Sequence, residues 1–276
     1  MKYKIILDSS SNIREDFYKD ENISIEIAPL TVSIDGKDFV DDGKADIAEM
    51  LRMNHVSKVG GKTTCPSPFE YVSKMNGADK YILITISSKL SGSYNSANVA
   101  KSTYEHPEDV IVIDSLSSCG VLELIARKAI DLIHEGVDFA EIEEQLNTFR
   151  DNSYILFIME KYDNFIRTGR VNKIIASLAT LLHIKPLATG KNGIIELKEK
   201  VRTITGTMKR ILANIKSMCP NTTGKVCVIS HTMNEKDALI LKGEIEREFN
   251  FKEIVIRVNE TLCAFYSLEG ALMVSF

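Results

Sequence analysis

Residues 81–93, which read Tyr-Ile-Leu-Ile-Thr-Ile-Ser-Ser-Lys-Leu-Ser-Gly-Ser, decide the fold class. The first six residues form an almost continuous apolar run, which is typical of a strand buried on both faces of a parallel sheet. The serine- and glycine-rich loop that follows leads into a helical pattern over about 94–103. A buried strand, a polar loop and a helix in this order indicate a βαβ unit, so the sequence predicts an α/β protein.

The same alternation of strands and helices continues on both sides of this stretch. Strands are expected over residues 5–7, 23–27, 110–113 and 154–159, and helices over 121–134 and from 139 onward. Residues 62–68 are expected to be a loop because they contain two prolines, and Ser67 is expected to cap a helix that has Pro68 at its first position. We therefore predict an N-terminal domain, residues 1–160, built on a mostly parallel sheet.

The pattern changes near residue 160. A helical stretch over 164–182 is interrupted by Gly169, and Lys191-Asn192-Gly193 stands between two extended runs, which is a strong hairpin signal. Helices over 204–215 and 236–249 then alternate with strands over 226–229 and 254–258. We expect a mixed α+β domain over 161–276.

Composition narrows the class of protein. The chain has 276 residues, of which 44% are apolar and 26% charged, which is ordinary for a globular protein of one large or two average domains. The formal net charge of −4 offers no overall attraction to nucleic acid or to an anionic membrane. The five cysteines are widely spaced and form no CxxC pair, so neither a disulfide framework nor a cysteine zinc site is expected.

The common catalytic and targeting signals are missing from the sequence. The first apolar run ends at Asp8, too early for a signal peptide or a membrane span, so we expect a cytoplasmic protein. No GxSxG, Walker, HExxH or GxGxxG motif occurs, and the five histidines lack metal-ligand spacing, with His231 the best catalytic candidate among them. We expect no cofactor, no metal and no catalytic residue.

Hydroxyl-rich loops follow several of the predicted strands. They are Asp8–Ser11, Thr63–Thr64, Ser87–Ser93 and Asp114–Ser115. In parallel α/β sheets, ligands bind beyond the carboxyl ends of the strands, where hydroxyls and free backbone N–H groups hold carboxylate or phosphate oxygens. The alternative is that these side chains only cap helices.

Two arginines stand beside small residues. Arg170 follows Thr168-Gly169, and Arg202 precedes Thr203 at the end of a charged extended run. The planar guanidinium suits recognition of carboxylate or phosphate, although surface salt bridges would explain both residues equally well.

These motifs, in this order, resemble the DegV family over the whole chain. Residues 62–68 resemble the family's Thr-Ser-Gln-Pro-Ser loop, and residues 87–97 resemble its SSxLSGTYxSA segment, which is the most specific match. Residues 114–120, the Arg167–Val171 turn, and the stretch from Ile184 through Gly193 to Arg202 are similar to further family motifs.

The resemblance implies a two-domain DegV-like fold with a fatty acid bound between the domains. It also implies that the carboxylate is presented to a separate ATP-dependent subunit of fatty acid kinase, which makes the acyl phosphate. The residues that match the family's carboxylate site are Thr63, Thr64, Ser91, Gly92, Ser93 and Tyr266, and those that match its phosphotransfer and docking face are Arg170 and Arg202.

One departure from the family stands near the C-terminus. The family usually has a histidine followed by a Gly-Pro-Gly-like turn, whereas this chain has Tyr266 at the histidine position and lacks the proline. A tyrosine hydroxyl can donate to a carboxylate, but it carries no positive charge near neutral pH. Glu269 adds a negative charge nearby.

Three functions remain open at this point. The first is a fatty acid carrier that works with a kinase. The second is an enzyme that acts on a small phosphorylated or acylated substrate and uses the loop at 87–93 as a phosphate cradle. The third is a lipid carrier or sensor without kinase coupling, which the departure at Tyr266 suggests. For a lipid carrier, the helices around 125–133 and 174–182 are expected to supply the apolar walls.

Overall fold

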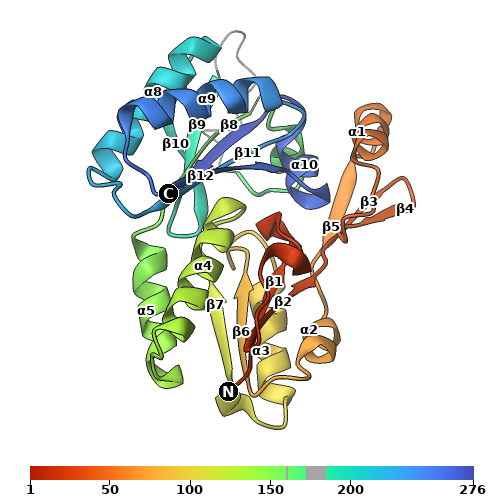
Figure 1. Cartoon of the computed structure of the whole chain (residues 1–276). Coiled ribbons are helices and arrows are strands. Elements are labelled where there is room, and N and C mark those ends of the chain that lie inside the picture. Colours follow the sequence, from red (N-terminus) through yellow and green to blue (C-terminus); the bar gives the residue numbers. More distant parts are fainter. Residues whose placement is uncertain (160, 172–184) are drawn as a thin grey trace.

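The computed structural model describes residues 1–159, 161–171 and 185–276. The chain forms three sheets with helices packed around them (Figure 1). The strands are β1 (Tyr3–Asp8), β2 (Ile23–Ala28), β3 (Thr31–Ile34), β4 (Lys37–Val40), β5 (Gly61–Thr64), β6 (Lys80–Thr85), β7 (Val110–Asp114), β8 (Ile155–Ile158), β9 (Lys185–Lys191), β10 (Ile194–Val201), β11 (Val226–His231), β12 (Glu253–Val258) and β13 (Leu272–Ser275). The helices are α1 (Ile47–Val56), α2 (Pro68–Lys74), α3 (Ser93–Thr103), α4 (Gly120–His134), α5 (Phe139–Asp151), α6 (Asp163–Arg167), α8 (Ile204–Met218), α9 (Glu235–Glu248) and α10 (Thr261–Ser267).

The first sheet is parallel, as the sequence predicts. Its strand order is β2-β1-β6-β7, and every neighbouring pair runs in the same direction. Ile5 and Leu7 on one face pack with α4 and α5, whereas Ile6 on the other face packs with α2 and α3. The strands are therefore buried on both faces, which explains why they appear in the sequence as continuous apolar runs.

A small antiparallel sheet extends from one side of the molecule (Figure 1). Its order is β4-β3-β5, and α1 and α10 pack against it through one apolar cluster. The prediction of a loop over 62–68 was wrong for residues 62–64, because these residues pair with β3. The remainder agrees with the prediction: the Ser67 hydroxyl accepts a hydrogen bond from the Glu70 N–H, and Pro68 begins α2.

The second large sheet has the order β10-β9-β8-β13-β11-β12. The strand predicted over 154–159 exists, but it pairs with β9 and β13 in this sheet rather than with the parallel one. The reason is long-range pairing with β13, a strand that the sequence did not reveal. We therefore propose a domain boundary between α5 and β8, a few residues before the predicted position at 160.

The two faces of this sheet have different neighbours. Leu156 and Ile158 face α8 and α9, whereas Ile155 and Phe157 join the core cluster of the parallel sheet. Because side chains alternate along a strand, β8 belongs to two hydrophobic cores at once. The face that carries Ile155 and Phe157 borders the candidate site described below.

The predicted hairpin is confirmed, since β9 and β10 pair antiparallel around Asn192-Gly193. Both turn residues have positive φ, 51° and 83°, which is the reason for an Asn-Gly pair at this position. Gly193 also approaches the loop after β6, where the Ser87 hydroxyl donates to the Gly193 carbonyl at 2.7 Å. A Cβ at Gly193 would lie 2.6 Å from that hydroxyl.

The predicted helix over 164–182 is seen only at its beginning, in α6, and its remainder lies largely outside the described residues. Among the helices that the structure describes, none has the length and apolar character needed to cross a membrane.

Candidate functional site

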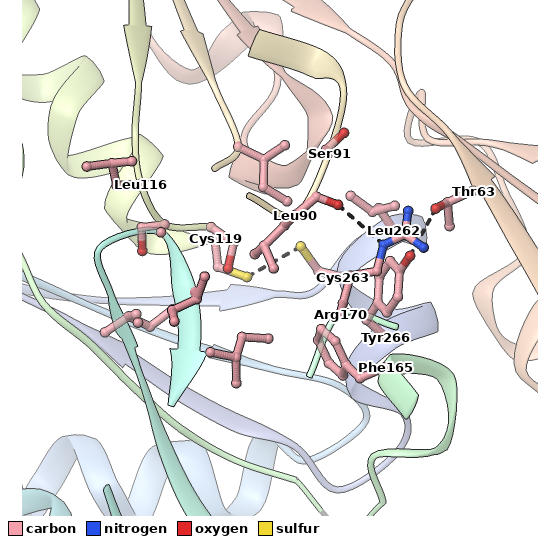
Figure 2. Close-up of a pocket in the computed structure, with 18 of the residues that line it drawn as sticks. Thr63, Leu90, Ser91, Leu116, Cys119, Phe165, Arg170, Leu262, Cys263 and Tyr266 are labelled. Atoms are coloured by element: carbon pink, nitrogen blue, oxygen red, sulfur yellow. Dashed lines mark hydrogen bonds between the residues drawn. The ribbon is translucent and has the colours of Figure 1, made fainter. Parts of the chain in front are cut away.

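A cavity of about 140 Å³ lies where the loops of the parallel sheet meet the inner face of the second sheet. Figure 2 shows its lining, with Thr63, Arg170 and Tyr266 together on one side and Leu116 on the other. The apolar side chains of the wall are Leu30, Ile86, Leu90, Leu116, Ile155, Phe157, Phe165, Ile194, Ile195, Leu262 and Met273.

Part of the apolar wall comes from alternate residues on one face of the second sheet. Ile155 and Phe157 of β8, Met273 of β13 and Ile195 of β10 are all buried and all line the cavity. These residues lie on the face of the second sheet that packs into the core cluster of the parallel sheet. The cavity is therefore continuous with a hydrophobic core, which suits an apolar ligand.

The polar end of the cavity is formed by side chains from distant segments. The Thr63 hydroxyl on β5 and the Tyr266 hydroxyl on α10 are 2.9 Å apart and share a hydrogen bond. The Tyr266 ring lies against Phe165, with 4.7 Å between the ring centroids. Packing thus fixes the ring while the hydroxyl faces the cavity, as Figure 2 shows.

Arg170 brings the positive charge of this end. Its Nε donates to the Leu90 carbonyl at 3.3 Å, and its Nη1 donates to the Thr168 carbonyl. These two bonds hold the guanidinium beside the polar loop and beside Thr63 and Tyr266 (Figure 2). A fixed guanidinium next to two hydroxyls is a suitable partner for a carboxylate.

The loop at 87–93 contributes Ser91 and Gly92 to the lining of the cavity, whereas Ser93 lies behind them and does not reach the cavity. Ser93 is fully buried, and its hydroxyl is 3.0 Å from the Ser91 hydroxyl. A Cβ at Gly92 would lie 3.2 Å from the Cys65 sulfur, a close contact that a small shift of the Cys65 side chain would have to relieve. Ser93 therefore orients Ser91 from below.

A buried carboxylate supports this loop. Asp8 accepts hydrogen bonds from the Ser10 hydroxyl at 2.5 Å and from the Ile86 N–H at 2.8 Å. Burial raises the pKa of Asp8 to about 6, although these hydrogen bonds lower it. The Asp8–Ser11 loop thus acts on the site through the backbone at Ile86, and the full burial of Ser9, Ser10 and Ser11 keeps their hydroxyls away from ligand.

Several residues that the sequence singled out lie elsewhere. Thr64 is exposed on the opposite side of β5 from Thr63. Arg202 is exposed just beyond the end of β10, and at about 3.3 Å per residue it is roughly 20 Å along the strand from Ile195. Glu269 borders a second, smaller cavity rather than this one. The predicted wall over 125–133 was wrong, because this part of α4 belongs to the core of the parallel sheet.

His231 is buried and does not line the cavity. Its Nδ1 accepts a hydrogen bond from the Asn234 N–H at 3.2 Å, and burial lowers the pKa of the imidazole. Within the described ranges, one group of potential metal ligands has its donor atoms within 4.8 Å of one another. It consists of His106, Glu108 and Asp109, and none of the three lines the cavity.

Sequence reasoning missed two cysteines of the wall. Cys119 and Cys263 both line the cavity, and their sulfur atoms are 3.4 Å apart (Figure 2). They are separated by 144 residues in the chain, so no local pattern brings them together.

Known proteins are similar to this chain over its whole length. The family model described as "Uncharacterised protein, DegV family" matches residues 2–276. The chain belongs to the DegV family. A DegV domain-containing protein of Streptococcus pneumoniae is 34% identical over 281 residues, which cover 100% of this chain and 99% of the relative.

Solved structures of other DegV proteins contain fatty acids. The Streptococcus pneumoniae Fatty Acid Kinase (Fak) B3 protein loaded with linoleic acid has a TM-score of 0.93 and 32% identity, covering 100% of this chain and 99% of that one. A DegV family protein from Eubacterium eligens loaded with heptadecanoic acid has a TM-score of 0.90 and 27% identity, with coverage of 99% and 98%.

Proposed function

We propose that this DegV protein binds a long-chain fatty acid in the cavity and presents the carboxylate to a separate, ATP-dependent kinase subunit, which makes the acyl phosphate. The observation that carries the proposal is the division of one cavity into an apolar wall and a polar end with a fixed arginine. The site residues proposed for the carboxylate are Thr63, Ser91, Arg170 and Tyr266.

The two parts of the cavity match the two parts of a fatty acid. Each buried methylene contributes about 0.8 kcal/mol, so a long chain in the apolar wall gains roughly 10 kcal/mol before the entropy losses of binding. Arg170 and the hydroxyls of Thr63 and Tyr266 supply donors for the carboxylate. A ligand of this kind should survive purification.

The kinase partner is supported by likeness to the Fak B3 protein, which covers 100% of this chain. Arg202 is exposed and remote from the apolar wall, which suits a residue that faces a partner rather than the lipid. Tyr266 takes the position of the family's histidine without adding positive charge, so Arg170 becomes the main cation of the polar end. We propose that the protein acts in the cytoplasm.

The phosphate-cradle alternative fits the geometry less well. The loop at 87–93 opens onto an apolar wall, and the buried carboxyl of Asp8 supports it from below. A phosphate dianion at that point would lose its hydration against apolar side chains and lie near a second acid. A fatty acid fits better, because only its carboxylate needs hydrogen-bond donors and its tail can lie against the apolar wall.

The first test is native mass spectrometry of the purified chain, followed by solvent extraction of the ligand. We expect one long-chain fatty acid per chain, and no ATP turnover by the chain alone. Addition of a fatty acid kinase ATP-binding subunit and ATP should then produce acyl phosphate, trapped as the hydroxamate. A ligand-free chain that takes up no added fatty acid would contradict the binding proposal, and a lipid-loaded chain that no kinase subunit phosphorylates would contradict the coupling.

A further inference from the structure

Two thiols meet in the wall of the cavity. The Cys119 and Cys263 sulfur atoms are 3.4 Å apart, and both residues are buried, with 2% and 6% of their surface exposed. Figure 2 shows the pair between the polar end and Leu116, facing the space that a bound chain would occupy. Cys119 directly precedes α4, and Cys263 lies in α10. The two thiols therefore come from segments far apart in the sequence and meet at the cavity.

The environment of Cys119 favours a reactive thiolate. Cys119 is the N-cap residue of the 15-residue helix α4, where the positive end of the helix dipole stabilises negative charge. Contact with Cys263 lowers the pKa of the Cys119 thiol, while the same contact raises the pKa of Cys263. The Met273 sulfur, 3.4 Å from Cys119, completes a patch of soft atoms in the wall.

We propose that Cys119 and Cys263 reduce a hydroperoxide group carried by the bound fatty acid. This inference rests on the proposed binding of a fatty acid. The Cys119 thiolate attacks the terminal oxygen of the hydroperoxide, the O–O bond breaks, and a hydroxy fatty acid leaves after it takes up a proton. Cys119 becomes a sulfenic acid, and the Cys263 thiol attacks that sulfur to form a disulfide and water. Overall, one hydroperoxide and two thiols give one alcohol, one disulfide and one water.

The position of the pair explains the choice of substrate. Hydroperoxides of unsaturated acids form beside the double bonds, in the interior of the chain. Figure 2 shows Cys119 between Leu116 and the polar end, with Cys263 on the side of Cys119 that is nearer to Tyr266. Linoleic acid, which the Fak B3 structure contains, is an acid of this kind. Cys219 and Cys227 lie in the core cluster between the second sheet and the helices α8 and α9, and neither lines the cavity. Cys65 lines the cavity but no second thiol stands beside it among the described residues.

The test uses the full-length chain, reduced and freed of excess reductant, with one equivalent of the hydroperoxide of linoleic acid. We expect stoichiometric conversion to the hydroxy acid, loss of two titratable thiols, and a disulfide-linked peptide pair that contains Cys119 and Cys263. In Cys119→Ser the conversion should fall to the rate without protein. In Cys263→Ser, dimedone should trap a sulfenic acid on Cys119 and no disulfide should form. Cys227→Ser is the matched control and should behave as the wild type.

Three results would overturn the inference. One is full conversion by Cys119→Ser. Another is oxidation of the pair by hydrogen peroxide as rapidly as by the lipid hydroperoxide at equal concentration, because the acyl cavity would then contribute nothing. The third is a chain that binds linoleic acid but leaves its hydroperoxide intact, which would leave the proposed function standing. Failure to bind any long-chain fatty acid, linoleic acid included, would instead remove the proposed function, and this inference with it.

Discussion

The two ends of the cavity are built from different kinds of sequence. The apolar end includes alternate residues of β8, β10 and β13, which lie on one face of the second sheet, together with apolar side chains from the loops and helices around it. The polar end uses single residues from β5, from the turn after α6 and from α10, which only tertiary packing brings together. Many positions therefore share the apolar wall, whereas each donor of the polar end stands alone.

This difference has an energetic consequence. Apolar contact adds free energy in proportion to the area buried, whereas a hydrogen bond exchanged for one with water contributes only about 1 kcal/mol. The wall should determine how tightly a ligand is held, and the polar end should determine which end of it faces the kinase. Substitutions at the two ends should accordingly differ in size and in kind.

The largest effect is expected from a charge in the apolar wall. Ile195→Glu places an unpaired carboxylate against the acyl chain, and we expect the Kd for fatty acid to rise at least ~100-fold. Leu239→Glu is the matched control, because Leu239 is 55% exposed on α9 and does not line the cavity. Isothermal titration with the delipidated chain measures both.

A folding defect in Ile195→Glu would be seen as a lower melting temperature. For that case Ile195→Ala keeps the wall apolar and should weaken binding roughly tenfold, since it removes three carbon atoms from the contact. Wild-type affinity in both Ile195 variants would break the comparison, because the wall would then contribute little.

The next effect separates the two arginines. Arg170→Gln removes the cation of the polar end, and we expect affinity for fatty acid to fall about 10- to 100-fold, or about 1.5–3 kcal/mol. Arg202→Gln should leave affinity unchanged but reduce acyl phosphate formation with the kinase subunit. Equal loss of affinity in both variants would mean that Arg202 reaches the lipid, contrary to its exposed position beyond β10.

A pH effect on stability is expected at Asp41, because its hydrogen-bond partner Leu262 lines the cavity. Asp41 is buried, its Oδ2 accepts from the Leu262 N–H at 3.2 Å, and burial raises its pKa to about 6. The folded state therefore holds a proton that the unfolded state releases, so this group reduces stability as the pH rises from about 4 to about 6. Asp41→Asn should raise the free energy of unfolding by about 1–3 kcal/mol at neutral pH, with no gain near pH 4.

Urea unfolding of the wild type and Asp41→Asn between about pH 4 and about pH 8 gives this difference directly. Asp42→Asn, at an exposed neighbouring position, should change the stability by less than about 0.5 kcal/mol throughout. A gain in Asp41→Asn that does not depend on pH would assign the effect to packing instead of to the proton.

The sequence predicted most of the fold because its signals are local. The long apolar runs of the parallel sheet and the Asn192-Gly193 turn each determine their own conformation. Membership of a sheet is different, since the pairing of β8 with β13 joins residues more than a hundred positions apart. Strand β5 was missed because its four residues, Gly61–Thr64, contain no apolar side chain.

The candidate site divides in the same way. The loop at 87–93 and Arg170 stand out in the sequence because serine, glycine and arginine interrupt apolar stretches. The apolar wall could not be assigned, because the side of a strand that faces a cavity depends on the partner sheet. Nothing in the sequence indicated that Cys119 and Cys263 form a pair, because they lie 144 residues apart in the chain.

The smallest effect is the sharpest test of the polar end. Thr63 and Thr64 are adjacent on β5, but only Thr63 lines the cavity, with its hydroxyl 2.9 Å from that of Tyr266. Valine keeps the shape and the strand preference of threonine, so Thr63→Val removes one hydrogen-bonding group and little else. We expect a fivefold loss of affinity, about 1 kcal/mol, for Thr63→Val and no change for Thr64→Val. An equal loss in both variants, measured by competition with a fluorescent fatty acid, would mean that the carboxylate is bound by the β5 loop as a whole and not by the single hydroxyl that faces Tyr266.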